Sequence, residues 1–345
     1  APAPTVRGMS VPRGRHVRTL DLDAIPRGRL ECLWVHIVNN RLGEPIRVPV
    51  VVVRGAHEGP VFGLTAAIHG NELNGIPIIQ HLAHELDPAR LRGTVVGALV
   101  LNVPGLLLEQ RVFNDGQDLN RLAPGNPHGT VSEIYIHRII ERIISCFDYH
   151  VDLHTASFGR VNSHYVRADM DDPITARMAR LQSSDIIVHN APSPTNLRGA
   201  ASRRGIHSIT VELRDPHVFQ DAVVEDGLLG ARNLLVDLGM LEGSLACPLE
   251  ETILCRSSEW SYTDEGGILH VGPQVLQTLA EGEPMAEVRT IFGDVIKRYY
   301  APAAGIVVGK SVNPLNQTGS RIVHLGHEPT AIPCITAEDG APLRG

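Results

Sequence analysis

The sequence contains few aromatic residues, no excess of positive charge and no long apolar run. Aromatic residues make up 4% of the 345 residues, which argues against a stacking surface for single-stranded nucleic acid. The formal net charge is -7 at pH 7, which argues against nucleic acid or an anionic membrane as the main partner. No stretch of about 18 apolar residues is present, and the first residues lack the basic-then-apolar pattern of a signal peptide. We therefore expect a cytoplasmic protein with no nucleic-acid and no membrane partner.

Cysteine is sparse as well. The five cysteines are odd in number, scattered and never spaced as C-x-x-C: Cys32, Cys146, Cys247, Cys255 and Cys334. This pattern favours neither a thiolate metal site nor a disulfide framework. Cys247 and Cys255 could nevertheless form a single bridge.

Apolar residues alternate between strand and helix periodicity from residue 46 to about residue 241. The periodicity predicts strands over 47–54, 61–68, 93–103, 147–153, 184–189 and 208–213, and helices over 74–86, 132–147, 172–181 and 225–238. Ser132 is a plausible cap of the second helix. Strands that alternate with helices predict an α/β sheet, whose mixed or parallel character this pattern leaves open.

The two ends of the chain differ from this central part. Residues 1–45 hold short extended segments, such as 30–38, which we expect to pack on the central α/β part of the chain. Residues 246–345 hold many short β-prone runs broken by Gly and Pro, which predicts a small C-terminal all-β barrel or sandwich domain. The sequence thus predicts a central domain over residues 46–245 between these two segments, and the motifs within it, described next, mark it as the expected catalytic domain.

Two of the predicted strands end in residues that can bind a metal ion. His69 and Glu72 follow the strand over 61–68, and His154 closes the strand that begins near residue 147. Strand ends of an open α/β sheet converge on one crevice. Two imidazoles and one carboxylate form a three-ligand zinc set with a fourth position open for water, although such a set also accepts cobalt, manganese or nickel. The alternative for the first motif alone is a loop histidine beside a helix-capping glutamate.

Asp152 lies two positions before His154. A metal-bound histidine usually donates its second N–H group to a carboxylate or a carbonyl, and Asp152 could fill this role. Strand alternation also puts both side chains on one face, so Asp152 could instead approach the site itself or support a neighbouring loop.

A polar, glycine-containing cluster spans residues 114–121. The guanidinium of Arg121 and the amide of Asn120 could together hold a substrate carboxylate. Arg111, just before the cluster, could polarise a scissile carbonyl. The alternative is a surface loop with a structural salt bridge.

Glu212 lies in an apolar strand, where an unpaired carboxylate would be costly. It could act as the general base that takes a proton from metal-bound water and passes it to the leaving amine. Alternatively, it could pair with Arg214 or face outward.

The four motifs H-x-x-E, D-L-N-R, D-L-H-T and a glutamate in an apolar strand occur in this order. The chain thereby resembles the succinylglutamate desuccinylase and aspartoacylase family of zinc-carboxypeptidase-like hydrolases over about residues 45–240. The resemblance implies a mixed central sheet flanked by helices and a small C-terminal β domain at the mouth of the site. It also implies one zinc ion per chain and the following roles: His69, Glu72 and His154 as metal ligands, Glu212 as general base, Asn120 and Arg121 on the substrate carboxylate, and Arg111 on the carbonyl.

The sequence departs from the family in two places. The loop between Arg111 and Asp118 is slightly longer than in aspartoacylase, and the arginine that reads a substrate side chain has no clear counterpart. The candidates for it are Arg160, Arg167, Arg198, Arg203 and Arg204.

The expected function is zinc-dependent hydrolysis of the amide bond of an N-acyl amino acid or a related small carboxylate. The alternatives are a metallocarboxypeptidase that trims a peptide and a non-catalytic binding protein on the same fold. A symmetric homo-oligomer is a further expectation.

Overall fold

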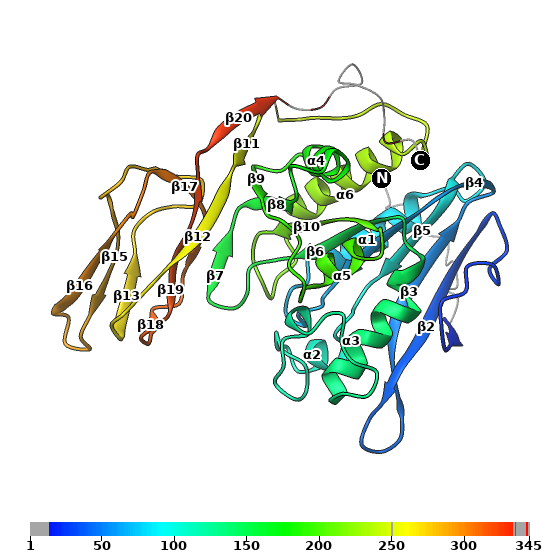
Figure 1. Ribbon diagram of the computed structural model, residues 1–345, viewed down its shortest axis with the longest axis horizontal. Coiled ribbons are helices and arrows are strands. Elements are labelled where there is room, and N and C mark those ends of the chain that lie inside the picture. Colours follow the sequence, from blue (N-terminus) through cyan, green and yellow to red (C-terminus); the bar gives the residue numbers. More distant parts are fainter. Residues whose placement is uncertain (1–13, 250, 334, 336–342, 344–345) are drawn as a thin grey trace, which may run out of the picture.

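The computed structural model describes residues 14–249, 251–333, 335 and 343. Part of the predicted N-terminal segment (1–13) and part of the C-terminal one lie outside the described residues. A large mixed sheet carries helices on both faces, and a second β region lies beside it (Figure 1). This arrangement confirms the predicted α/β fold with a mixed central sheet and additional antiparallel sheets in the C-terminal region.

Eleven strands form the main sheet. Their spatial order is β1 (Arg15–Val17), β2 (Arg29–Asn39), β3 (Pro45–Arg54), β5 (Arg92–Ala98), β4 (His57–Ala66), β6 (Tyr149–His154), β10 (His207–Leu213), β8 (His164–Ala168), β9 (Ile186–His189), β11 (Glu251–Cys255) and β20 (Thr330–Pro333). At its centre β4, β6 and β10 run parallel, whereas β8 runs antiparallel to β10. The C-terminal ends of the three central strands therefore meet at one edge of the sheet.

The helices cover the sheet on both faces. They are α1 (Gly75–Glu85), α2 (Val103–Leu107), α3 (Val131–Arg142), α4 (Pro173–Arg180), α5 (Leu197–Ser202) and α6 (Asp221–Asp237), with 3-10 turns at Leu119–Arg121 and Ile144–Cys146. Residues of α1, α4 and α6 share one hydrophobic core, and residues of α3 and α5 share the other. Alternate valines of β3 belong to opposite cores, Val51 to the first and Val52 to the second. None of the helices in the described part is long and apolar enough to span a bilayer.

Several predicted boundaries are wrong, among them two of helix α3 and one of the strand before α2. Helix α3 is capped by Thr130, which forms a capping box with Glu133, whereas the buried Ser132 donates a hydrogen bond to Asp115 Oδ2 at 2.7 Å. The same helix ends at Arg142 rather than near residue 147. The strand predicted for 93–103 ends at Ala98, because Asn102 already caps α2 by accepting from the Gly105 N–H group.

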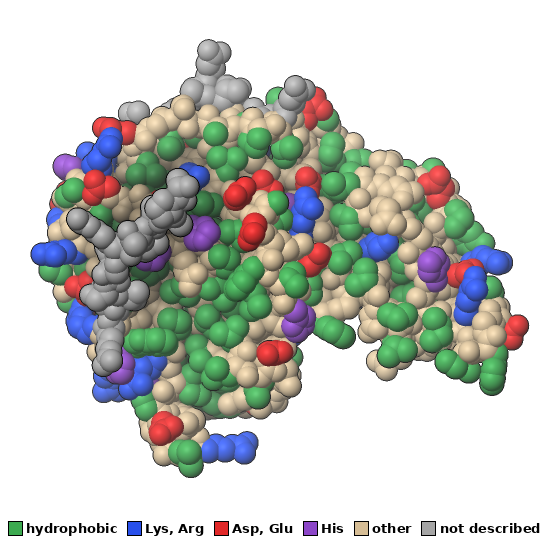
Figure 2. Space-filling model, turned by 180° about the vertical axis from the view of Figure 1, so that it is seen from behind, with side chains coloured by type: hydrophobic (Ala, Val, Ile, Leu, Met, Phe, Trp, Pro, Cys, Tyr) green, Lys and Arg blue, Asp and Glu red, His purple; other side chains and the backbone are tan. Residues whose placement is uncertain are grey.

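The C-terminal region consists of short strands, and residues 251–333 contain no helix. Its strands are β12 (Ser257–Tyr262), β13 (Gly267–Val271), β14 (Thr278–Leu279), β15 (Pro284–Arg289), β16 (Val295–Tyr300), β17 (Gly305–Ser311), β18 (Leu315–Asn316) and β19 (Arg321–His327). They enclose a core of their own around Val288, Val307 and Leu325. Seen from behind, the region forms a separate lobe beside the larger α/β part (Figure 2).

Each part of the molecule contributes strands to a sheet of the other part. Strand β7 (Arg160–Asn162) of the α/β part pairs with β17, whereas β11 and β20 join the main sheet. In the N-terminal part, β2 pairs with β3 in the main sheet. The division of the chain near residues 45 and 245 stays a prediction.

The cysteines depart from the expectation. Cys247 is disulfide-bonded, whereas Cys255 is a buried free thiol. A bridge between these two residues is therefore excluded.

Candidate metal centre and active site

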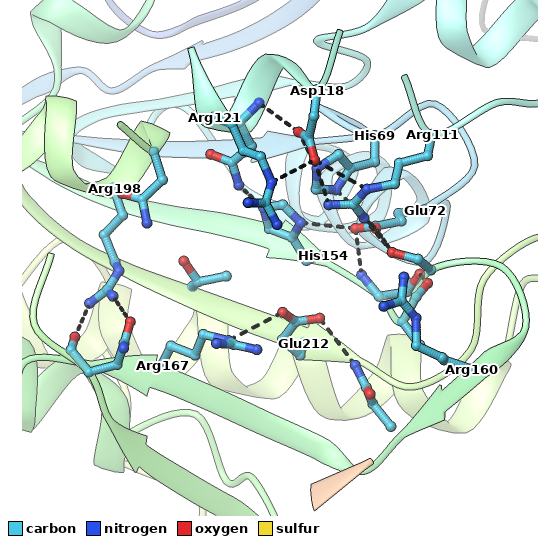
Figure 3. A pocket seen from close by; sticks show the side chains of 18 of the residues that line it. His69, Glu72, Arg111, Asp118, Arg121, His154, Arg160, Arg167, Arg198 and Glu212 are labelled. Atoms are coloured by element: carbon cyan, nitrogen blue, oxygen red, sulfur yellow. Dashed lines mark hydrogen bonds and ion pairs between the residues drawn. The ribbon is translucent and has the colours of Figure 1, made fainter. Parts of the chain in front are cut away.

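The predicted site residues meet where the three parallel strands end. His154 is the last residue of β6, and His69 follows the end of β4 by a short turn. Glu212 of β10 is the register partner of His154. These side chains all line one pocket (Figure 3).

His69, Glu72 and His154 form a compact, buried group. Their potential ligand atoms lie within 4.8 Å of one another. The Nδ1 atoms of His69 and His154 each lie 2.9 Å from a different oxygen of Glu72. His69 and Glu72 come together in a turn, in which the Glu72 N–H group donates to the His69 carbonyl at 3.1 Å, before α1 begins at Gly75. The structure therefore brings the three predicted ligands together without a helix.

Both imidazoles are oriented by a second carboxylate. His154 Nε2 lies 2.8 Å from Asp152 Oδ2, and His69 Nε2 lies 3.1 Å from Asp118 Oδ1. A neutral imidazole that donates from Nε2 has its lone pair on Nδ1, which here faces Glu72. Within the described part of the chain, the buried Nδ1 atom of His69 has no hydrogen-bond partner. This arrangement fits a metal ion bound by two Nδ1 atoms and one carboxylate.

The charges of the group also favour a cation at its centre. Burial raises the pKa of Glu72, but the nearby charge of His69 and the hydrogen bond and charge of His154 outweigh it and hold this pKa well below its usual value. Burial lowers the pKa of His154, but Asp152 and Glu72 raise it well above its usual value. Without a metal ion this ring therefore carries a proton on Nδ1 as well, which a bound metal ion would displace. The carboxylates are thus ionised and attract positive charge.

Arg111 and Asp118 continue this polar network. Arg111 Nη1 donates to Glu72 Oε1 at 2.8 Å and to the Ser157 hydroxyl, and Arg111 Nη2 donates to Asp118 Oδ2 at 3.0 Å. Burial raises the pKa of Asp118, but His69 and Arg111 together bring it far below its ordinary value. Arg111 therefore lies directly beside one of the candidate metal ligands.

Asn120 and Arg121 line the pocket from the 3-10 turn that follows Asp118. Asn120 Oδ1 accepts from the Leu197 N–H group at 2.8 Å, which ties this turn to the start of α5. The Arg121 side chain is 71% exposed and its Nε atom lies 3.5 Å from Asp118 Oδ2. Its guanidinium is thus accessible to a ligand.

Glu212 faces the pocket with a side chain that is only 12% exposed. It accepts from Asn162 Nδ2 at 3.3 Å and lies 3.5 Å from Arg167 Nε. The predicted alternative partner, Arg214, instead lies near Asp185 at 3.7 Å. Glu212 therefore points inward and does not pair with Arg214.

The pocket encloses about 330 Å3 and is rich in arginine. Of the five candidates for reading a substrate side chain, Arg160, Arg167 and Arg198 line it. Arg203 and Arg204 are engaged elsewhere, with the Pro194 carbonyl and Glu141.

Sequence reasoning missed several lining residues. Asp118 is the first residue of the D-L-N-R motif, two positions before Asn120, and Ser157 closely follows His154, so their proximity to the motifs was a usable signal. Trp260 and Arg321 come from β12 and β19 of the C-terminal region. No local pattern marks these two residues, because only long-range strand pairing brings them to the pocket.

Known proteins with similar sequences include a deacetylase and a desuccinylase. The chain is 26% identical over 266 residues to the N-alpha-acetyl-L-2,4-diaminobutyric acid deacetylase of Halomonas elongata, covering 74% of each protein. It is 29% identical over 170 residues to the succinylglutamate desuccinylase of Pseudomonas paraeruginosa, covering 45% of this chain and 51% of the relative.

Solved structures share the fold. A succinylglutamate desuccinylase/aspartoacylase from Rhodobacter sphaeroides superposes with a TM-score of 0.80 at 22% identity, covering 90% of this chain and 98% of the other. The product-bound ectoine utilization protein EutE (DoeB) from Ruegeria pomeroyi gives 0.79 at 21% identity, covering 88% and 97%. Residues 58–238 match the sequence model of the succinylglutamate desuccinylase/aspartoacylase catalytic-domain family. The chain therefore belongs to the succinylglutamate desuccinylase/aspartoacylase family.

Proposed function

We propose that this protein is a zinc-dependent deacylase that hydrolyses the amide bond of an N-acyl amino acid or a related small carboxylate. The observation that carries the proposal is the orientation of His69 and His154, whose Nδ1 atoms face Glu72 at 2.9 Å beside Glu212 in one pocket. The relatives that are named a deacetylase and a desuccinylase support the choice of an amide substrate.

His69, Glu72 and His154 would hold one zinc ion per chain. When bound, such an ion polarises a carbonyl group and makes a water molecule more acidic. Arg121 and Asn120 bind the carboxylate of the amino-acid part, so that the scissile amide is fixed before attack. Arg111 Nη1, which lies 2.8 Å from Glu72 Oε1, donates to the carbonyl oxygen as negative charge develops on it.

Glu212 moves the proton. Its carboxylate takes a proton from the attacking water and passes it to the departing nitrogen, so that the amine leaves in neutral form. Asn162, which donates to Glu212 Oε2 at 3.3 Å, and Arg167, 3.5 Å from Glu212 Oε1, hold the carboxylate in place for both transfers.

The test is the metal content of the purified protein together with its hydrolysis of N-acyl amino acids. We expect about one zinc ion per chain in the wild type, and its loss in His69→Ala and His154→Ala. His57→Ala, which changes an exposed histidine, should keep the metal. Absence of bound metal even after zinc is supplied would overturn the proposal, and so would release of C-terminal residues from peptides without deacylation. The cytoplasmic location and the homo-oligomer stay predictions.

A further inference from the structure

Two side chains from other strands contact the carboxylate of Glu212 (Figure 3). Asn162 Nδ2 donates to Glu212 Oε2 at 3.3 Å, and Arg167 Nε lies 3.5 Å from Glu212 Oε1. Asn162 is the last residue of β7, and Arg167 lies on β8. The position of the carboxylate therefore depends on what fixes these two partners.

Asn162 belongs to a row of paired residues that crosses from the α/β part into the C-terminal region. Asn162 of β7 pairs with Gly309 of β17, and Gly309 pairs in turn with His324 of β19. His324 then pairs with Trp260 of β12, so the row runs over four neighbouring strands (Figure 1). Because paired residues of adjacent strands point to the same face of a sheet, the amide of Asn162 lies beside Gly309.

Gly309 leaves the room that the Asn162 amide occupies. A Cβ atom at Gly309 would overlap Asn162 Oδ1 and would lie 3.0 Å from the Val161 carbonyl oxygen. Atoms in favourable non-bonded contact are about 3.5–4.0 Å apart. Any side chain at Gly309 would therefore push the amide away from the place in which it donates to Glu212.

Arg167, the second partner, is held by Tyr165. Arg167 Nη2 donates to the Tyr165 hydroxyl, and the guanidinium carbon lies 5.2 Å from the centre of the Tyr165 ring, in range of a cation–π interaction. The Tyr165 ring is buried in a small core with Ile306 and Val308 of β17. It also lies edge-on to His324, with ring centres 5.9 Å apart. Strands β17 and β19 therefore support the second partner as well.

His324 is itself fixed in place. It stacks on Trp260 with ring centres 5.0 Å apart and an angle of 8° between the planes, and its Nε2 atom lies 2.8 Å from the Ser258 hydroxyl. Burial lowers the pKa of His324 well below its usual value, so the ring is uncharged. A rigid, neutral ring thus packs against Tyr165.

We propose that strands β17 and β19 of the C-terminal region position the proposed general base. On one side of Glu212, Gly309 leaves room for Asn162. On the other side, the packing of Tyr165 holds Arg167. Gly309, Tyr165 and His324 are thus positioning residues, which act on the reaction through the two partners of Glu212.

This inference rests on the proposed deacylase function, in which Glu212 transfers the proton. Alignment of the carboxylate matters for that step, because a misplacement of about 1 Å can lower a rate about 100-fold. The C-terminal region would then contribute to the chemical step as well as to the wall of the pocket.

The experiment measures kcat and KM on an N-acyl amino acid with zinc-loaded enzyme. Gly309→Ala should lower kcat about tenfold, the effect of one lost hydrogen bond to a charged group, and should leave KM and zinc content unchanged. In an Asn162→Ala background, Gly309→Ala should lower kcat no further, because both changes remove the same contact. The matched control is Gly272→Ala, whose Cβ atom would lie 3.9 Å from the Met285 carbonyl oxygen, and it should keep the wild-type kcat.

His324 provides a second test on the side of Arg167. His324→Ala removes the ring that packs against Tyr165 and should lower kcat, whereas His324→Phe keeps an aromatic ring there and should recover most of the activity. An unchanged kcat in Gly309→Ala, or an equal loss of kcat with and without Asn162, would overturn the inference and leave the deacylase function intact.

A measurement without turnover separates the inference from the deacylase function. In protein isotopically labelled at the carboxyl carbons of glutamate, the NMR signal of Glu212 is the one that Glu212→Gln lacks. Its chemical shift should change in Gly309→Ala and in Tyr165→Phe but not in Gly272→Ala. If the wild type hydrolyses no N-acyl amino acid, the deacylase function fails, and this signal decides. A change then supports the positioning of Glu212 by the C-terminal strands, and an unchanged signal overturns it.

Discussion

Glu212 and His154 are register partners on the neighbouring parallel strands β10 and β6. Paired residues of adjacent strands point to the same face of the sheet, and the strands lie about 4.8 Å apart. The proposed base and one proposed metal ligand are therefore held at a distance set by backbone hydrogen bonds rather than by flexible loops. Such placement on rigid strands keeps the two groups aligned during turnover.

Glu212→Gln should retain the metal and lose activity. The substitution removes the group that accepts the proton but keeps its shape and the ligands His69, Glu72 and His154. Loss of a general base lowers the rate by about 100- to 10,000-fold. The measurements are kcat on an N-acyl amino acid and zinc content. The control Glu225→Gln changes an exposed residue of α6 and should keep full activity. A wild-type rate in Glu212→Gln would make Glu212 a structural residue.

Arg121→Ala should weaken substrate binding without loss of metal. The side chain is 71% exposed and makes only a long contact with Asp118, so its removal should not disturb the fold. Loss of one charged contact to a substrate carboxylate raises KM by about tenfold or more. Arg203→Ala removes an arginine that is occupied outside the pocket and is the matched control. A loss of zinc in Arg121→Ala would instead indicate a structural role for this loop.

Much of the fold could be predicted from the sequence, because the spacing of apolar residues indicates which face of a helix or strand is buried. The three helices predicted at 74–86, 172–181 and 225–238 correspond to α1, α4 and α6. Strand β8 and helix α5 were not predicted. In the segment His164–Ala168, the polar residues His164 and Arg167 lie at a buried and a half-buried position, so polar residues do not mark an exposed face. The six residues of α5 are too few to show a helical period.

Only the part of the site that consists of short sequence motifs could be predicted from the sequence. The metal-binding motifs lie at strand ends, so the general rule for open sheets places them together. Trp260 and Arg321 reach the pocket through the pairing of β12 with β19 and of β19 with β17, which pairs with β7. Pairing between strands so distant in sequence leaves no periodic trace around either residue.

Thr65 belongs to a chain of buried hydrogen bonds behind His154. Its hydroxyl donates to Asp152 Oδ1 at 2.6 Å and lies 2.8 Å from His150 Nε2, and the Ser208 hydroxyl lies 2.9 Å from His150 Nδ1. Burial lowers the pKa of His150 to about 4, so this ring is neutral. This series of hydrogen bonds thus fixes the carboxylate of Asp152, which orients His154.

Thr65→Val should weaken zinc binding although Thr65 is not a ligand. The change removes one hydrogen-bond partner from Asp152 and one from His150, which we expect to weaken the metal affinity by about tenfold and to cost about 1–3 kcal/mol of stability. Competition with a zinc chelator measures the affinity. Thr175→Val is the matched control, because it removes a hydrogen bond to the Asp169 carbonyl at 2.7 Å away from the site. If Thr65→Val and Thr175→Val bind zinc equally tightly, the hydrogen bonds of Thr65 do not affect the metal site.

His164 should make the protein less stable in mild acid. Burial lowers its pKa to about 4, whereas the unfolded value is about 6.5. Between these values the unfolded chain binds the proton more readily, so the free energy of unfolding falls as the pH falls from about 6.5 to about 4. For this residue alone, the loss between pH 7 and pH 5 is about 2 kcal/mol.

The variant His164→Phe isolates this contribution. The buried Nε2 atom of His164 has no hydrogen-bond partner within the described residues, so an apolar ring is a suitable replacement. Urea unfolding at pH 7 and pH 5, with a chelator present in all samples, should show a smaller loss of stability in the variant than in the wild type. His57→Gln, an exposed position, should behave as the wild type does. If the free energy of unfolding depended on pH in the same way in the wild type, His164→Phe and His57→Gln, His164 would not be the source of the loss of stability in acid.

The walls of the pocket have separate hydrophobic cores behind them. The proposed base Glu212 and the proposed ligand His154 are carried by the main sheet, whereas Arg321 stands on β19, which contributes to the C-terminal core, and Trp260 stands on β12, which pairs with β19. Substitutions in that second core can therefore shift Trp260 and Arg321 while the strands that hold Glu212 and His154 keep their register. The shape of one side of the pocket is thus adjustable independently of the backbone that carries the groups at the strand ends.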